Sequence, residues 1–163
     1  MNIEIRRVEP SDYKAVQQVH AQRNALRGTL QLPFPSEEMW KQRLEAMGED
    51  KYALVACIEG EIVAMGGLDL FPKSPRRRHA GHIGLAVHDK WQSKGVGRAL
   101  MKALIDAADN WLNLSRLELT VFTDNEPALK LYQNLGFVIE GTHKKFAFRD
   151  GEYIDAHTMA RVR

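Results

Sequence analysis

The segment 92–98 has residue types suited to binding an anion. It reads Gln-Ser-Lys-Gly-Val-Gly-Arg, which places Gly95 and Gly97 two residues apart with the cations Lys94 and Arg98 beside them. Glycines let a backbone come close to a ligand, and the free N–H groups at the start of a helix, aided by the helix dipole, favour an anion. We therefore predict a site for a pyrophosphate group at this segment.

Two other nucleotide-binding patterns do not fit the segment. A dinucleotide fingerprint needs a third glycine three residues after Gly97, where the chain has Leu100. A Walker loop needs Gly-Lys-Ser/Thr, which the segment lacks. Instead, the segment stands between an apolar strand pattern that ends at Val87 and an amphipathic helical pattern that begins near Val96, which is the setting of a strand–loop–helix anion site.

The composition is that of one ordinary globular domain. The chain has 163 residues, of which 44% are hydrophobic and 27% are charged. These values fit a single domain over residues 1–163 and exclude collagen-like, low-complexity and disordered chains. The 23 Lys and Arg residues exceed the 21 Asp and Glu residues by too little to predict a nucleic-acid-binding surface, so we expect no nucleic acid as a partner.

Two features indicate a cytoplasmic location. The single cysteine, Cys57, lies in the apolar run 52–58 and has no partner for a disulfide or a multi-cysteine metal site. The amino terminus lacks the basic and apolar stretches of a signal peptide, and no apolar segment approaches the ~18 residues of a membrane span. We therefore expect neither export nor contact with a membrane.

The periodicities that must position these residues alternate between strand and helix. The expected elements, in order, are a strand over 2–8, a helix capped at 11–12, a loop, a helix over 36–47, strands over 52–58, 62–71 and 82–87, a helix from 96 to about 112, a strand over 115–122, a helix over 128–135, and strands over 137–141, 144–149 and 152–159. This order predicts a mixed, mostly antiparallel α/β sheet of about seven strands with about four helices. Only the central strands, 82–87 and 115–122, are expected to be parallel.

Two motifs of the chain resemble the GNAT superfamily of acetyl-coenzyme A-dependent N-acetyltransferases. The segment 92–98 is similar to the family's pyrophosphate loop, Gln/Arg-x-x-Gly-x-Gly/Ala, which follows a Leu-x-Val strand, here Leu85-Ala86-Val87. The family's pattern around its last helix is matched by Asn125, Ala128, Leu131, Tyr132, Gly136 and Phe137. The resemblance covers nearly the whole chain in element order and implies the GNAT fold, in which the central parallel pair is splayed.

The resemblance implies acetyl-CoA as cosubstrate. The backbone N–H of Leu85 would bond the thioester carbonyl, and Val87 would pair with the pantetheine arm like an added strand. The implied cofactor-binding residues are Leu85, Ala86, Val87, Gln92, Ser93, Lys94, Gly95, Val96, Gly97, Arg98, Asn125, Ala128 and Tyr132. We expect no metal, because the six histidines show no metal-ligand spacing.

The resemblance also implies catalytic groups. A family tyrosine at the position of Tyr132 protonates the departing thiolate, although a helical tyrosine can also be a packing residue. The attacking amine must first lose a proton. Where many relatives have a glutamate early in the Leu-x-Val strand, this chain has Gly81 followed by His82. The base is therefore left open among His82, Glu118 acting through water, and no single side chain.

The acceptor side is similar to that of bacterial enzymes that acetylate free L-amino acids. This similarity rests on the segments 29–33, 118–122 and 151–153. It implies a small-molecule amine as partner, and the residues predicted at the substrate are Thr29, Leu30, Gln31 and Phe34. Because the stretch 29–40 combines small, apolar and aromatic residues, we expect apolar amino acids to be preferred.

Several alternatives stay open. The acceptor could instead be a protein lysine, a protein N-terminus, a polyamine or an antibiotic, and the missing glutamate allows a non-catalytic acyl-CoA sensor. The run Arg76–Arg78 could contact the 3′-phosphate of the coenzyme or be a solvated loop. Phe34, Met39 and Trp40 could line the acceptor pocket or belong to the core, and a homodimer is left open. Cys57 is not expected to be a nucleophile, since burial in an apolar strand would raise its pKa.

Overall fold

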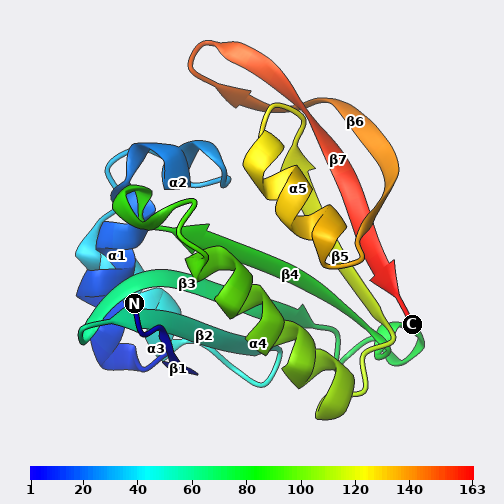
Figure 1. Cartoon of the computed structure of the whole chain (residues 1–163), viewed down its shortest axis with the longest axis horizontal. Helices are drawn as coiled ribbons and strands as arrows, with labels where there is room; N and C mark the ends of the chain where they lie inside the picture. The colour runs from blue at the N-terminus through cyan, green and yellow to red at the C-terminus, as the bar shows by residue number, and fades with distance from the viewer.

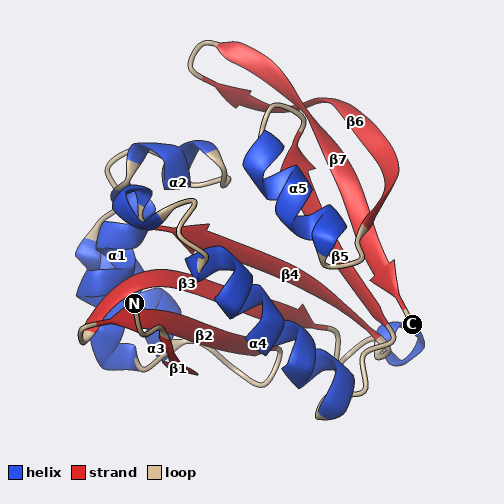
Figure 2. Ribbon diagram, in the orientation of Figure 1, coloured by secondary structure: helices blue, strands red, loops and turns tan.

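The chain forms one seven-stranded sheet with helices on both faces (Figure 1; Figure 2). The computed structural model describes residues 1–163, and the strand order is β1-β2-β3-β4-β5-β7-β6. The strands are β1 (Glu4–Arg7), β2 (Lys51–Ile58), β3 (Glu61–Leu70), β4 (Ala80–Val87), β5 (Arg116–Phe122), β6 (Val138–Arg149) and β7 (Glu152–Val162). The α-helices are α1 (Tyr13–Ala21), α2 (Arg23–Arg27), α3 (Glu37–Glu45), α4 (Val96–Asn110) and α5 (Glu126–Asn134). None of these helices combines the length and the apolar character that crossing a membrane requires.

The two sheet faces bury different helices because successive strand side chains point to opposite sides. In β2, Leu54 and Ala56 belong to the main core, which includes Leu100 and Leu104 of α4. The alternate residues Val55 and Cys57 pack in a smaller cluster with residues of α1 and α3. The helix α4 therefore lies on one face, and α1 and α3 lie on the other.

The central strands β4 and β5 separate soon after they meet. They are the one parallel pair of the sheet, and they pair at three positions only, the last of which is His82 with Glu118. Both strands continue for several residues beyond this pair, and Figure 1 shows them diverging from the end of the sheet near the C-terminus. The expected splay of a central parallel pair is confirmed, and we call the opening between the diverging strands the fork.

Two local expectations were wrong. The segment between the first two predicted helices contains the short helix α2 instead of only a loop. The three closing strands expected from 137 to 159 are two longer strands, β6 and β7. The apparent break in β6 is an irregularity between His143 and Ala147, where Lys145 has a φ of 50°. The Lys145 N–H donates to Asp155 Oδ1 at 2.8 Å, which satisfies the backbone where the strand ladder is interrupted.

Candidate active site

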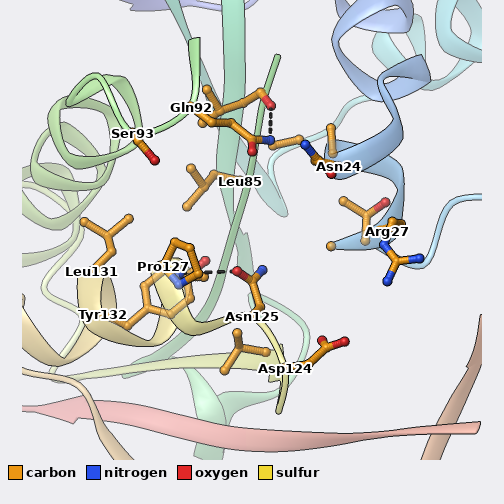
Figure 3. A pocket seen from close by; sticks show the side chains of 18 of the residues that line it. Asn24, Arg27, Leu85, Gln92, Ser93, Asp124, Asn125, Pro127, Leu131 and Tyr132 are labelled. Carbon is orange, nitrogen blue, oxygen red and sulfur yellow. Dashed lines mark hydrogen bonds between the residues drawn. The ribbon is translucent and has the colours of Figure 1, made fainter. Parts of the chain in front are cut away.

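A pocket of about 600 Å³ opens at the fork (Figure 3). Its wall is built from α2, β4, the segment 92–98, β5, the start of α5 and the end of β6. Of the residues predicted at the site, those on the wall are Thr29, Leu85, Ala86, Val87, Gln92, Ser93, Gly95, Gly97, Arg98, Asn125, Ala128 and Tyr132. The fold therefore brings both sequence motifs to one cavity.

The segment 92–98 presents unpaired backbone N–H groups to this pocket. Gly95 precedes α4 with a φ of 84°, a left-handed conformation that favours glycine. No backbone carbonyl accepts the N–H groups of Val96, Gly97 or Arg98, and no side chain caps the helix. Orphan N–H groups at the start of a fifteen-residue helix form an anion site, so the segment fits a pyrophosphate.

The backbone of β4 also offers hydrogen-bonding groups to the fork. The His88 N–H donates to Val63 O at 2.9 Å, and in an antiparallel pair such bonds alternate along the strand. By this alternation, Leu85 and Val87 turn their N–H and C=O groups away from β3 and toward the fork. The Gln92 side chain confirms the direction at Val87, because its Nε2 donates to Val87 O at 3.1 Å.

Not every residue predicted in the loop reaches the cavity. Val96 is 1% exposed and packs in the main core. Lys94 is exposed off the pocket wall, with its ammonium 5.1 Å from the centre of the Trp91 ring. The Gln92 amide also donates to Asp89 Oδ1 at 3.3 Å, and Asp89 accepts the N–H groups at the start of α2. Gln92 and Asp89 therefore tie the loop to α2.

The start of α5 frames the opposite side of the pocket. Asn125 caps this helix, since its Oδ1 accepts the Ala128 N–H at 3.3 Å. Figure 3 shows Asn125, Pro127, Leu131 and Tyr132 together below Leu85. The cap fixes the backbone that presents these side chains.

Tyr132 combines a buried ring with a hydroxyl that has no protein partner. The residue is 9% exposed, and its ring lies 6.0 Å from that of Phe137. Among side-chain nitrogen and oxygen atoms, only Trp40 Nε1 is both fully buried and without a hydrogen bond. The Tyr132 hydroxyl, which also lacks a protein partner, is therefore not fully buried. Burial raises the pKa of Tyr132 to about 12, so the phenol is protonated at neutral pH. Tyr132 thus presents a proton donor to the pocket.

The two candidate bases lie at the base of the fork and off the pocket wall. Burial raises the pKa of Glu118, but hydrogen bonds from Arg116 and Arg77 outweigh burial and hold it below its ordinary value. An ion-paired carboxylate with a lowered pKa is a poor proton acceptor. His82 lies 3.8 Å from a carboxylate oxygen of Asp69 and is part-exposed. The geometry gives neither residue a direct route to the pocket.

Within the run Arg76–Arg78, whose role the sequence leaves open, Arg77 contacts the protein itself. Its Nη2 is 3.0 Å from both carboxylate oxygens of Glu118, and its guanidinium lies 5.1 Å from the Phe71 ring centre. The residue therefore braces the base of the fork.

The predicted acceptor residues are only partly at the pocket. Thr29 lines it, whereas Leu30 and Phe34 point to solvent, with Phe34 98% exposed. Gln31 accepts a hydrogen bond from Arg43 at 2.7 Å, away from the cavity. Trp40 is 6% exposed and belongs to the smaller core cluster, which settles its position as core. The aromatic residues of this stretch therefore do not line the pocket.

Sequence reasoning missed several charged and polar residues of the pocket. They are Asn24 and Arg27 of α2, Asp124 before α5, and Arg149 at the end of β6. Arg149 forms an ion pair with Asp124, and its Nη1 donates to Arg27 O at 3.1 Å. The one sequence signal near them is the Asp150-Gly151 turn, which places Arg149 at a hairpin end but not beside α2.

Comparisons of the sequence point to acetyltransferases. The model of the acetyltransferase (GNAT) family matches residues 19–137. The chain is 48% identical over 161 residues to the L-amino acid N-acetyltransferase AaaT of Escherichia coli K12, covering 99% of this chain and 98% of that protein. It is 29% identical over 146 residues to the spermine/spermidine N(1)-acetyltransferase of Bacillus subtilis 168, covering 86% of this chain and 91% of that protein.

Comparisons of the structure agree on the fold. An acetyltransferase of the GNAT family from Streptococcus pneumoniae has a TM-score of 0.82 at 28% identity, covering 99% of this chain and 100% of that chain. A phosphinothricin acetyltransferase of Sinorhizobium meliloti, solved in complex with acetyl-CoA, has a TM-score of 0.87 at 20% identity, covering 99% of this chain and 89% of that chain. The expected fold is thereby confirmed.

Proposed function

This chain belongs to the GNAT family of acetyltransferases and is an N-acetyltransferase, and we propose that its acceptor is the α-amino group of a free L-amino acid. The observation that carries the proposal is the placement of the anion loop, the backbone of β4 and Tyr132 around one pocket at the fork. The relative that acts on L-amino acids supports the acceptor class, because the alignment spans nearly the whole of both chains.

Acetyl-CoA fits the groups that line the pocket. The unpaired N–H groups at the start of α4 would hold its pyrophosphate, with Arg98 adding positive charge. Val87 would pair with the pantetheine arm through the backbone groups it turns to the fork, and the Leu85 N–H would hold the thioester oxygen. The related acetyltransferase solved with acetyl-CoA supports the same cosubstrate here.

The chemistry proposed is direct transfer of the acetyl group from sulfur to nitrogen. The neutral amine attacks the thioester carbon, the Leu85 N–H stabilises the charge on the carbonyl oxygen, and a C–N bond replaces the C–S bond. The Tyr132 hydroxyl gives its proton to the leaving sulfur, and the proton of the amine leaves to water or a base. Burial raises the pKa of Tyr132 and would raise that of the coenzyme thiol in the same direction, so the phenol stays protonated until the leaving sulfur develops charge beside it.

A polyamine is the second candidate acceptor. Polyamine acetyltransferases are also relatives, at lower identity and coverage than the amino acid enzyme. The expected preference for apolar amino acids also remains part of the proposal. It no longer rests on the aromatic residues of 29–40, since Trp40 is core and Phe34 is exposed.

A thiol-release assay over a panel of acceptors tests the proposal. The panel contains apolar and charged L-amino acids, spermidine and a short peptide, each mixed with acetyl-CoA and the wild-type protein. We expect the L-amino acids, and the apolar ones most, to release thiol fastest. Faster release with spermidine or the peptide would overturn the proposed acceptor, and binding of acetyl-CoA without release across the panel would favour the sensor alternative.

A further inference from the structure

The charged residues of the pocket are unevenly placed. The wall contains one carboxylate, Asp124, and three arginines, Arg27, Arg98 and Arg149. Arg98 belongs to the start of α4, on the side of the anion loop. Figure 3 shows Arg27 and Asp124 on the side opposite Ser93 and Leu131. Arg27 and Asp124 therefore lie away from the segment 92–98, which is proposed to hold the pyrophosphate.

Three elements that are far apart in sequence are tied together at this side. Arg149 pairs with Asp124, and its Nη1 donates to the carbonyl oxygen of Arg27 at 3.1 Å. The Arg149 side chain is only 18% exposed, so the pair is partly shielded from water. Arg27 in turn pairs through Nη1 with Asp150, the first residue of the hairpin turn. These contacts hold a cation and an anion beside each other on the pocket wall.

Both groups keep unused hydrogen-bonding capacity. The pair with Asp150 uses Nη1 of Arg27, and no protein group accepts from its Nε or Nη2. The pair with Arg149 uses Oδ2 of Asp124, and no protein group donates to its Oδ1. A guanidinium edge and a carboxylate oxygen are therefore available to a ligand in the pocket.

We propose that Arg27 binds the α-carboxylate of the acceptor amino acid and that Asp124, oriented by Arg149, accepts a hydrogen bond from its α-ammonium group. This inference rests on the proposed function and identifies the residues that distinguish a zwitterion from other amines. A free amino acid presents one anion and one cation on adjacent atoms, which match the guanidinium and the carboxylate. A polyamine presents only cations, so it has no anion for the guanidinium of Arg27 to bind.

The test compares an L-amino acid with the amine that differs from it only by lacking the carboxylate, such as L-phenylalanine and phenethylamine. For the wild type, kcat/KM should be higher with the amino acid. Arg27→Gln should lower kcat/KM for the amino acid by roughly 10- to 100-fold, mainly through KM, and change that for the amine less than about threefold. Arg27→Lys keeps the charge and should restore part of the selectivity.

Asp124 and Arg149 have different expected signatures. Asp124→Asn should lower kcat/KM for both acceptors, because both present an ammonium group. Arg149→Gln should raise KM for both in the same way, since it acts through Asp124 as a positioning residue. The matched control is Arg23→Gln in α2, an exposed arginine off the pocket wall, which should leave both acceptors unaffected. Melting temperature and acetyl-CoA titration are measured for each variant to establish that it is folded.

The outcomes separate this inference from the proposed function. Suppose that the wild type acetylates amino acids, and that folded Arg27→Gln either loses activity equally with both acceptors or keeps full activity with both. Arg27 then does not bind the carboxylate, so the inference is overturned while the proposed function stands. If the wild type acetylates no amino acid, the proposed function fails and the inference with it. Selective loss with the amino acid supports both.

Discussion

His82 and Glu118 are the last paired residues of the parallel strands, and the pocket begins beyond them. Arg77 and Arg116 both hold the Glu118 carboxylate at this point. At the base of the fork, strand pairing joins β4 to β5, and the two arginines hold the side chain of Glu118 in place. The diverging ends of β4 and β5 are left with backbone groups that no neighbouring strand uses, which is where a substrate can bind.

Gly97→Asp should abolish binding of acetyl-CoA while the protein still folds. A Cβ at Gly97 would lie 3.4 Å from Leu85 Cδ1 and 3.6 Å from Leu131 Cδ2, distances that the side chains can accommodate. The added carboxylate would instead repel the pyrophosphate. Calorimetric titration with acetyl-CoA is the measurement, and Gly97→Ala, which adds only the methyl group, should keep most of the affinity. Unchanged affinity in folded Gly97→Asp would remove the loop from the coenzyme site.

Tyr132→Phe should lower kcat by roughly 10²-fold or more and leave the affinity for acetyl-CoA nearly unchanged, since the ring and its packing on Phe137 are kept. Steady-state thiol release paired with a binding titration measures both quantities. A fall of less than about threefold, under conditions where chemistry limits the rate, would identify Tyr132 as a packing residue.

Glu118→Gln should reduce stability more than turnover. The pKa of Glu118 is lowered in the folded state, so its ion pairs stabilise the protein above the unfolded-state pKa of about 4.3, and this contribution is lost as the pH falls through the folded-state pKa. We expect the free energy of unfolding to drop by about 1–2 kcal/mol at pH 7. Urea denaturation at pH 7 and pH 3 should show this difference shrinking in acid.

Turnover of Glu118→Gln is the companion measurement. A decrease of less than about threefold is expected from a carboxylate that is already paired with two arginines. A loss of roughly 10²-fold in a folded variant would restore Glu118 as the base.

Cys57→Ala should retain activity, because direct transfer needs no acyl-enzyme. Cys57 is 4% exposed in the smaller core cluster, and burial raises the pKa of its thiol. The substitution should cost about 1 kcal/mol of stability through lost packing. Loss of thiol release in a folded Cys57→Ala, together with an acetylated wild-type protein found by mass spectrometry, would contradict direct transfer.

The sequence predicts the parts of the site that depend on local pattern. The glycines and cations of 92–98 lie between a strand and a helix, and this order alone indicates an anion site. The motif from Asn125 to Tyr132 is located by its resemblance to the GNAT pattern, and its residues lie in one helix and its cap. In both motifs the residues that act together are close in sequence.

The charged side of the pocket could not be predicted in this way. Arg27, Asp124 and Arg149 come from three elements and meet only through tertiary contacts. The helix that carries Arg27 has five residues, too few to show a helical period. Likewise, the irregularity at Lys145 depends on Asp155 from the next strand. Such features need the fold before they can be seen.

A competition assay tests the central claim most directly. Equimolar L-methionine, spermidine and a peptide with a free N-terminal alanine are mixed with limiting acetyl-CoA and the enzyme, and the acetylated products are quantified by mass spectrometry. The product ratios report the ratios of kcat/KM for the three acceptors. We predict that N-α-acetylmethionine dominates, and a majority of acetylspermidine or acetylated peptide would contradict the account.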